Sequence, residues 1–265
     1  MWVPFSAGIQ SNGTLWTWGI NSSGNLGQGD QVQRSTPTQV GTLSTWTNVS
    51  VTGYGLGTTN FMMAVQNPGT LWGWGNSTIG QLGNNTTINF SSPVQIGTAS
   101  NWTRVSCGYF DTIAAVNYGT LYSSGANTFG QLGYYNVIPG PVQISTLSNW
   151  SQVCCGLNYA MAVQNTGLLY GWGNNSYGQL GTGDLTHRSS LVQVGTSSNW
   201  SRVACGYTHT AALQSNGTLW AWGTNSYGQL GQGNFINAST PIQVGTLSRY
   251  VTVYAMNYTT LAETQ

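Results

Sequence analysis

The sequence of 265 residues contains no lysine, and only 3% of its residues are charged, against roughly 25% in an average soluble domain. Its charged side chains are those of five arginines, three aspartates and one glutamate. Phosphate binding needs clustered lysine and arginine, so this composition argues against a nucleic-acid partner. A neutral surface also lacks the repulsion that keeps crowded molecules apart, so we expect a place in a larger assembly or outside the cell.

Residue patterns typical of catalytic sites, metal sites and membrane-spanning segments are also absent from the sequence. The two histidines and four acidic residues form no spacing typical of a zinc or calcium site. A phosphate-binding loop of the Gly-x-x-x-x-Gly-Lys type is excluded by the lack of lysine. No apolar run reaches the roughly 18 residues of a membrane helix, and residues 1–8 lack the basic start of an ordinary signal peptide. We therefore expect no enzyme activity, no cofactor, no metal and no membrane insertion.

The sequence is rich in glycine and tryptophan, with 37 and 12 residues, and both follow a repeat. A Gly-Thr-Leu-Trp-x-Trp-Gly segment returns with variations at Gly13, Gly69, Gly119, Gly167 and Gly217. Three other blocks keep the same phase: a Gly-Gln-Leu-Gly segment, a Pro-Val-Gln segment and an aromatic residue before a strand. The aromatic residues are Trp46, Trp102, Trp150, Trp200 and Tyr250. Four blocks in one phase indicate five repeats of about 50 residues.

The local pattern within each repeat is that of β-structure. Asn216-Gly217 is a turn pair, and the residues after it alternate between small or aliphatic side chains and tryptophan with a period of two. No segment shows a convincing helical period. Each repeat is therefore predicted to supply about four strands, which make one blade of a β-propeller.

The predicted architecture is all-β: a single propeller domain, 1–265, of about five four-stranded blades. The repeat units are 13–68, 69–118, 119–166, 167–216 and 217–265, and residues 1–12 precede them as a closing strand. Both chain ends resemble the strand at 210–216. Either five blades close with one spare strand, or an open ring is completed by a neighbouring chain.

Residues 203–231, Val-Ala-Cys-Gly-Tyr-Thr-His-Thr through Gly-Gln-Leu-Gly, resemble the regulator-of-chromosome-condensation repeat almost position for position. The resemblance covers nearly the whole chain and implies the propeller fold. Its best-known members resemble seven-bladed rings, whereas this chain has five units. The resemblance implies little about function, because one fold hosts unrelated activities.

Two sets of residues are predicted to hold the blades and loops together. Paired tryptophans suggest sugar binding or light sensing, but packing between blades explains them more simply. Asp30 with Arg34, and Asp184 with Arg188, occupy matching positions and are interpreted as loop ion pairs rather than a charged binding site. The predicted repeat core consists of Trp18, Trp74, Trp172, Trp222, Leu26, Leu82, Leu132, Leu180 and Leu230.

Cys107, Cys155 and Cys205 each precede a glycine at the same place in their repeats, and Cys154 is the fourth cysteine. Equivalent positions of a ring are too far apart to bridge. The cysteines are therefore interpreted as small buried side chains, with their redox state undetermined. The family resemblance implies a structural role for His209. Asp111 and Tyr159 take its place in other repeats, so it is not interpreted as a repeated metal ligand.

Three functions are weighed from these features. The first is a structural or adhesion protein of a virus particle, such as a bacteriophage capsid or tail, in a homo- or hetero-oligomer. The second is a secreted or cell-surface protein-binding module. The third, implied only by the family resemblance and disfavoured by the low charge, is a small-GTPase exchange factor that binds chromatin. The corresponding locations are the virion or the extracellular space, with the cytoplasm as the alternative.

Overall fold

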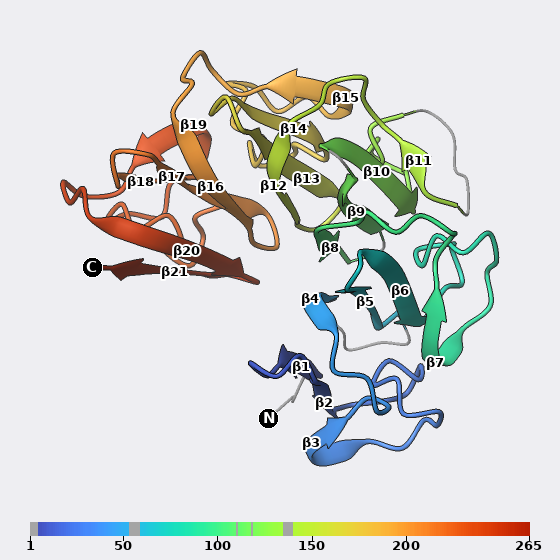
Figure 1. Cartoon of the computed structure of the whole chain (residues 1–265). Coiled ribbons are helices and arrows are strands. Elements are labelled where there is room, and N and C mark those ends of the chain that lie inside the picture. The colour runs from blue at the N-terminus through green and yellow to red at the C-terminus, as the bar shows by residue number, and fades with distance from the viewer. Residues whose placement is uncertain (1–4, 53–58, 110, 118, 135–139) are drawn as a thin grey trace. The chain divides into compact units, whose positions relative to one another are not determined.

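The computed structural model describes residues 5–52, 59–109, 111–117, 119–134 and 140–265, and of 111–117 it describes the backbone alone. All regular secondary structure in these residues is β-strand, so the predicted all-β class is confirmed (Figure 1). None of the described residues forms a helix long and apolar enough to cross a membrane.

Four sheets contain four antiparallel strands each, and in each sheet neighbours in sequence are neighbours in space. They are β4 (Trp46–Val51) to β7 (Phe90–Gln95) through β5 (Phe61–Gln66) and β6 (Thr70–Gly75); β8 (Val105–Cys107), β9 (Asp111–Asn117), β10 (Thr120–Gly125) and β11 (Val142–Gln143); β12 (Trp150–Cys155), β13 (Tyr159–Gln164), β14 (Leu169–Gly173) and β15 (Arg188–Gln193); and β16 (Trp200–Cys205), β17 (His209–Gln214), β18 (Leu219–Gly223) and β19 (Ala238–Gln243).

Two further sheets are incomplete. The N-terminal sheet has three strands, β1 (Ser6–Ile9), β2 (Leu15–Gly19) and β3 (Arg34–Gln39), which match the second, third and fourth strands of a complete blade. The C-terminal hairpin has two strands, β20 (Tyr250–Met256) and β21 (Thr259–Thr264), which match the first and second strands. The described residues therefore contain four complete blades and two partial sheets, and the predicted fifth blade is not confirmed.

The blades are also out of phase with the sequence repeats. Repeat 69–118 contributes β6 and β7 to one sheet but β8 and β9 to the next. A repeat therefore supplies four strands, as predicted, but does not make one blade. The chain forms two compact units, residues 1–126 with 137–143 and residues 127–136 with 144–265, and each is built from sheets packed face against face.

Successive blades within each unit are joined through one backbone carbonyl of the Gly-Gln-Leu-Gly turn. A side chain on the third strand of the next blade donates a hydrogen bond to the backbone carbonyl of the residue that precedes the leucine of this turn. The bonds are Trp74 Nε1 to the Asn25 carbonyl at 3.0 Å, Ser124 Oγ to Gln81 at 3.2 Å, Trp172 Nε1 to Gln131 at 2.9 Å and Trp222 Nε1 to Gln179 at 2.9 Å. All three tryptophans are fully buried.

The two glycines of the turn are required by this joint. A Cβ on Gly181 would lie 2.8 Å from Trp222 Nε1, and a Cβ on Gly178 would lie 2.5 Å from the Cα of Ser239 in the fourth strand of the next blade. Their φ angles are +75° and +78°, a region that favours glycine. The turn 178–181 therefore leaves one space for the Trp222 indole and another for Ser239.

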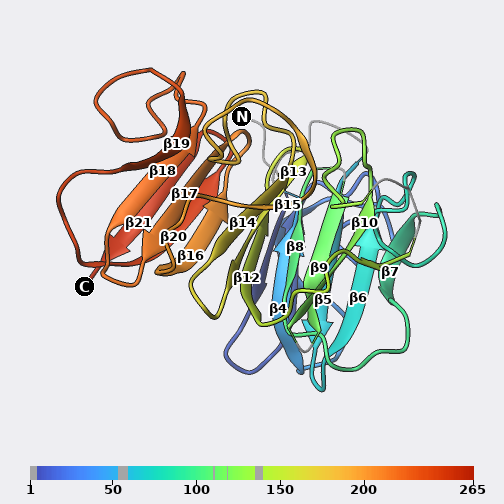
Figure 2. The same ribbon diagram turned by 90° about the horizontal axis from the view of Figure 1, so that it is seen from above.

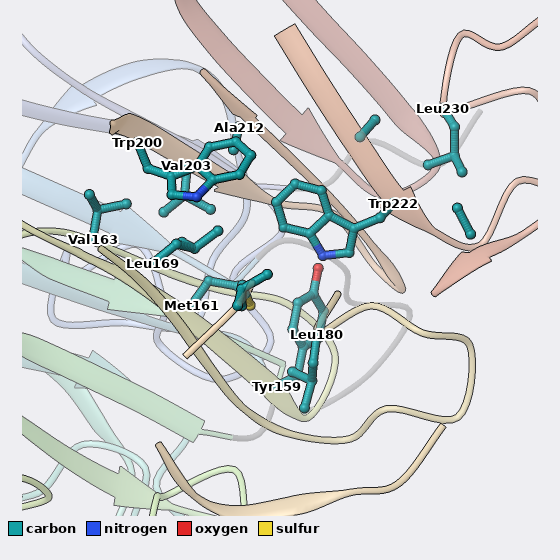
Figure 3. Close-up of a cluster of buried hydrophobic side chains, with 13 residues drawn as sticks. Tyr159, Met161, Val163, Leu169, Leu180, Trp200, Val203, Ala212, Trp222 and Leu230 are labelled. Atoms are coloured by element: carbon teal, nitrogen blue, oxygen red, sulfur yellow. The ribbon is translucent and has the colours of Figure 1, made fainter. Parts of the chain in front are cut away.

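The apolar core of the second unit forms around such a joint (Figure 3). The Trp222 ring lies among Tyr159, Leu180, Trp200 and Leu230, which come from successive blades. Trp200 and Trp222 meet edge to face with ring centroids 5.9 Å apart, a favourable arrangement for aromatic pairs.

The prediction that the cysteines would not pair is wrong for Cys154 and Cys205, which form a disulfide with Cα atoms 5.6 Å apart. Cys155, not Cys154, is the residue equivalent to Cys205. Strands β12 and β16 pack side by side in neighbouring blades, and this brings the residue one position earlier within bonding distance. Cys107 and Cys155 are not part of a disulfide.

We expect Trp222→Ala to lower the free energy of unfolding by about 3–5 kcal/mol, because it removes a fully buried indole and leaves a cavity. Trp18→Ala, at the equivalent but half-buried position of the N-terminal sheet, should cost less than half as much. Denaturant titration of both variants measures the difference. Equal losses would contradict the assignment of the joint.

Candidate functional site: an open socket beside the C-terminal hairpin

The two predicted loop ion pairs are formed but lie apart from any other charge cluster. Arg34 contacts Asp30 at 2.7 Å, and Arg188 contacts Asp184 at 2.5 Å. The hydrogen bond from Arg34 lowers the pKa of Asp30, and the backbone hydrogen bond from Thr186 is the main cause of the lowered pKa of Asp184. A buried asparagine, Asn21 or Asn175, donates to the same loop in each case.

No chemistry of catalysis or metal binding is assembled around these pairs. Within the described residues, no three His, Cys, Asp or Glu side chains gather closely enough to hold a metal ion. The predicted core leucines Leu26, Leu82, Leu132, Leu180 and Leu230 are buried in their turns. Of the four predicted core tryptophans, Trp18 differs, because it is only half-buried.

His209 fills a structural position at the start of β17. Its ring lies over Gly206, where a Cβ would approach the ring to 2.1 Å, and Tyr159 lies over Gly156 in the same way. The ring in each blade therefore explains why glycine follows Cys155 and Cys205. His209 Nε2 is 3.0 Å from Thr260 Oγ1, so the ring contacts the C-terminal hairpin, while burial lowers the pKa of His209 to about 4. The side chain of Asp111, its counterpart, lies outside the described residues.

A pocket of about 320 Å³ opens between the last complete blade and the C-terminal hairpin, a size within the range of ligand sites. Figures 1 and 2 show this hairpin beside β16 and β17. We call the pocket the socket. Its lining consists of the turn 228–231 with Leu219, Tyr227, Val244, Tyr258, Thr259, Thr260 and Ala262. The Tyr227 and Tyr258 rings meet at 4.9 Å, and Tyr227 is 70% exposed.

The socket is the place where a blade joint would form if a third and a fourth strand were present. Among the described residues no third or fourth strand pairs with the hairpin, and none of them places an indole or a serine against the turn 228–231. A Cβ on Gly228 would meet only Phe235 of its own loop, and one on Gly231 would meet only Val244. In the filled turns the matching glycines are covered by the next blade.

The backbone carbonyl in the socket accepts fewer hydrogen bonds from the described residues than its counterpart in a filled joint. The Gln229 carbonyl accepts Thr260 Oγ1 at 2.9 Å, as the Gln179 carbonyl accepts Thr210 Oγ1 at 2.8 Å. The Gln179 carbonyl also receives an indole N–H, whereas that of Gln229 receives none from the described chain. Gln229 Nε2 is buried without an acceptor, because Thr224 stands where Asn174 accepts from Gln179.

The outward face of the C-terminal hairpin is apolar and uncovered in the described structure. Tyr254, Met256 and Leu261 are 50%, 60% and 53% exposed. At the position of Leu261 the complete blades hold Met63, Met161 and Ala211, which are buried. An apolar patch of this kind indicates an interaction surface.

Sequence reasoning did not identify Gln229, Tyr227, Tyr258 or Thr260 as site residues. Gln229 belongs to the Gly-Gln-Leu-Gly motif, whose second residue is also buried in the other four repeats. The sequence alone therefore favours a structural role for Gln229. The available signal was the match between 258–265 and 210–216, which places a second-strand segment at the end of the chain.

We expect the stability of the protein to fall by roughly 3 kcal/mol as the pH drops from 6.5 to 4, because the unfolded chain protonates His209 while the folded chain keeps it neutral. Above pH 6.5 this contribution is constant. His209→Tyr, which copies Tyr159 of the preceding blade, should remove that part of the slope. Urea titrations of both proteins across this pH range measure it, and identical slopes would contradict the prediction.

Comparison with known proteins agrees with this architecture. The model of the RCC1-like domain matches residues 5–265. A search of curated protein sequences finds no match. Among solved structures, human WBSCR16 is similar at 22% identity with a TM-score of 0.84, and the match covers 98% of this chain and 70% of that one.

Yeast RCC1 (Prp20), solved bound to Kap60, matches at 18% identity with a TM-score of 0.79 over 97% of this chain and 65% of its own. Saccharomyces cerevisiae Prp20p, described with its binding to Gsp1p and histones, is similar at 19% sequence identity with a TM-score of 0.78. The match covers 96% of this chain and 65% of Prp20p. The chain thus spans just under two thirds of the length of Prp20p. These likenesses establish the β-propeller fold, and the extent of the family match shows that the chain belongs to the RCC1-like domain family.

Proposed function

We propose that the chain is a non-enzymatic protein-binding propeller that holds an extended segment of a partner in the socket. The observation that carries this is the pocket at the turn 228–231, which repeats the geometry of a filled blade joint without its occupant. The filled joints show that the geometry suits a β-strand that carries a large aromatic residue.

The edge of the C-terminal hairpin supports strand addition. β21 pairs with β20 and with no other described strand. The backbone N–H and C=O groups of alternate β21 residues, on the edge away from β20, therefore have no strand partner among the described residues. Exposed edges of this kind are usually guarded by lysine, other charged residues or proline. β21, Thr-Thr-Leu-Ala-Glu-Thr, has no lysine or proline, and Glu263 is its single charged residue. A partner strand can pair there while its side chains enter the socket, which is a common mode of peptide recognition.

The absence of enzyme activity belongs to the same proposal. The described titratable groups are few, and those with shifted pKa values are explained by loop ion pairs or by burial. No pair of them faces the socket in the arrangement that acid–base or nucleophilic chemistry needs.

The relatives favour a protein partner and bear on the alternatives weighed from the sequence. Prp20 is described with Kap60, Gsp1p and histones. Neither the family match nor the solved structures support a virus-particle component. The small-GTPase exchange factor weighed from the sequence is the second candidate function, since Prp20p is described with binding to Gsp1p, and a nucleotide-release assay with Gsp1p tests it. Accelerated release would make exchange the better assignment.

The binding proposal is tested with a displayed library of random 12-residue peptides, selected on the immobilised full chain. We expect peptides with tryptophan or tyrosine near a glycine, because those residues fill the equivalent joints. Thr259→Trp, at an exposed position on the rim of the socket, should weaken the binding of such peptides by at least about tenfold.

Thr196→Trp is the matched control, since it is exposed in the loop between β15 and β16 and neither lies on β21 nor lines the socket. It should leave peptide affinity unchanged. Peptides that bind both variants as well as they bind the original chain would contradict the socket as the binding site.

A further inference from the structure

Neighbouring sheets of one unit pack side by side through the first strand of each sheet. In the first unit β4 packs beside β8, and in the second unit β12 packs beside β16 and β16 beside β20. Strand register identifies one pair of equivalent positions at each of these contacts, which we call the contact pair. The contact pairs are Ser50 with Cys107, Cys154 with Cys205, and Ala204 with Ala255. The three pairs differ in the link that they can form.

The contact pair of the first unit is held by hydrogen bonds. Ser50 Oγ accepts the backbone N–H of Cys107 at 2.9 Å, and the Cys107 thiol donates to the Ser50 carbonyl at 3.4 Å. Asn48 on the same strand accepts the backbone N–H of Val105 at 3.1 Å. A contact between first strands therefore forms here without a covalent bond.

A disulfide stands at the same place in the second unit. Cys154 lacks the hydroxyl of Ser50, and its sulfur is bonded to that of Cys205. The next contact, between β16 and β20, has Ala204 and Ala255, whose methyl side chains can form neither link. First strands thus pack side by side with a hydrogen bond, with a disulfide or with neither at this position. The fold itself does not require the disulfide.

The two bonded cysteines are also open to solvent. Cys154 and Cys205 pack against the apolar core of the second unit, yet each is only partly buried. Cys107, at the position of Cys205 in the first unit, is buried. Exposed disulfides are the ones that exchange with thiols, whereas structural disulfides resist reduction.

From these observations we propose that Cys154 and Cys205 form a reversible thiol–disulfide exchange site. The site locks β12 to β16 when it is oxidised and releases the two strands when a low-molecular-weight thiol reduces it. Both cysteines lie within the second unit and neither lines the socket, so the inference does not depend on the proposed binding function.

The exchange balances with glutathione as the co-reactant. The thiolate of one glutathione attacks a sulfur of the disulfide, breaks the S–S bond and forms a mixed disulfide, while the released cysteine thiolate takes up a proton. A second glutathione thiolate attacks the glutathione sulfur of the mixed disulfide and releases the other cysteine, which is also protonated. The protein gains two thiols, and the two glutathiones leave as glutathione disulfide. The reverse sequence closes the lock.

Reduction frees the chain directly after Cys205. Gly206 accepts a hydrogen bond from Tyr159 Oη of the preceding blade at 3.3 Å, and the His209 ring lies over Gly206. These contacts do not need the disulfide, so we expect the reduced chain to stay folded but to open more readily at β16. The disulfide joins residues separated by 51 positions, and its loss should lower the Tm by on the order of 10 °C.

The test treats the disulfide-bonded full chain with millimolar glutathione in the absence of denaturant. We expect two further thiols to appear, the far-ultraviolet circular dichroism to stay unchanged, amide exchange in β16 to become faster and the Tm to fall. Glutathione disulfide should restore the original values. A disulfide that is reduced only when the chain unfolds overturns the inference, and so does a reduced chain with the original Tm and exchange rates.

Two serine variants identify the residue that exchanges with Cys205. Cys154→Ser should behave as the reduced chain and should not respond to glutathione. Cys155→Ser is the matched control, one residue further along β12, and should keep the full response. A Cys154→Ser chain that still forms a disulfide, or a Cys155→Ser chain that no longer responds, shows that the site is assigned wrongly.

Ser50→Cys tests whether the position alone is sufficient for the link. The variant places a cysteine at the equivalent of Cys154, next to Cys107. Glutathione disulfide should then form a second disulfide, within the first unit, and raise the Tm of the chain. If no second disulfide forms, the two contact pairs are not equivalent and the inference fails.

Discussion

The architecture depends on one contact, the hydrogen bond from a third-strand side chain to the backbone carbonyl of the turn in the preceding blade. The indole of Trp222 reaches the Gln179 carbonyl only because Gly181 has no Cβ, and the fourth strand reaches the turn only because Gly178 has none. The joint uses aromatic area and neutral hydrogen bonds. A chain in which 3% of residues are charged can therefore still pack a complete core.

The candidate site is the same contact without its occupant. At the turn 228–231 the glycines, the carbonyl and the lining apolar side chains are all in place, and the indole is not. A socket of this kind recognises backbone and shape rather than charge. Binding there should therefore depend little on salt, because the described lining contains no charged side chain.

The joint fixes only a few positions of each repeat in this chain, which shares its fold with solved structures at 18–22% identity. The joint needs two glycines, a leucine and a donor, and even the donor varies, since Ser124 replaces tryptophan in one blade. Loop and edge residues are free to differ once these are kept. Partners therefore cannot be transferred from Prp20p to this chain by fold alone.

The sequence by itself determined the β-strands, the repeat phase and the family, because each motif is local and returns five times. It also placed Asp30 near Arg34, since a four-residue spacing within one loop brings them together. Tertiary structure alone decided which strands share a sheet, because the repeat boundaries do not show that β6 pairs with β5 of the preceding repeat or that β7 and β8 belong to different sheets. It decided that Cys154 rather than Cys155 meets Cys205, because β12 and β16 lie side by side with an offset of one residue. It decided, finally, that Gln229 and Gly231 form an open socket, since a vacancy is a property of what lies beside a residue in space.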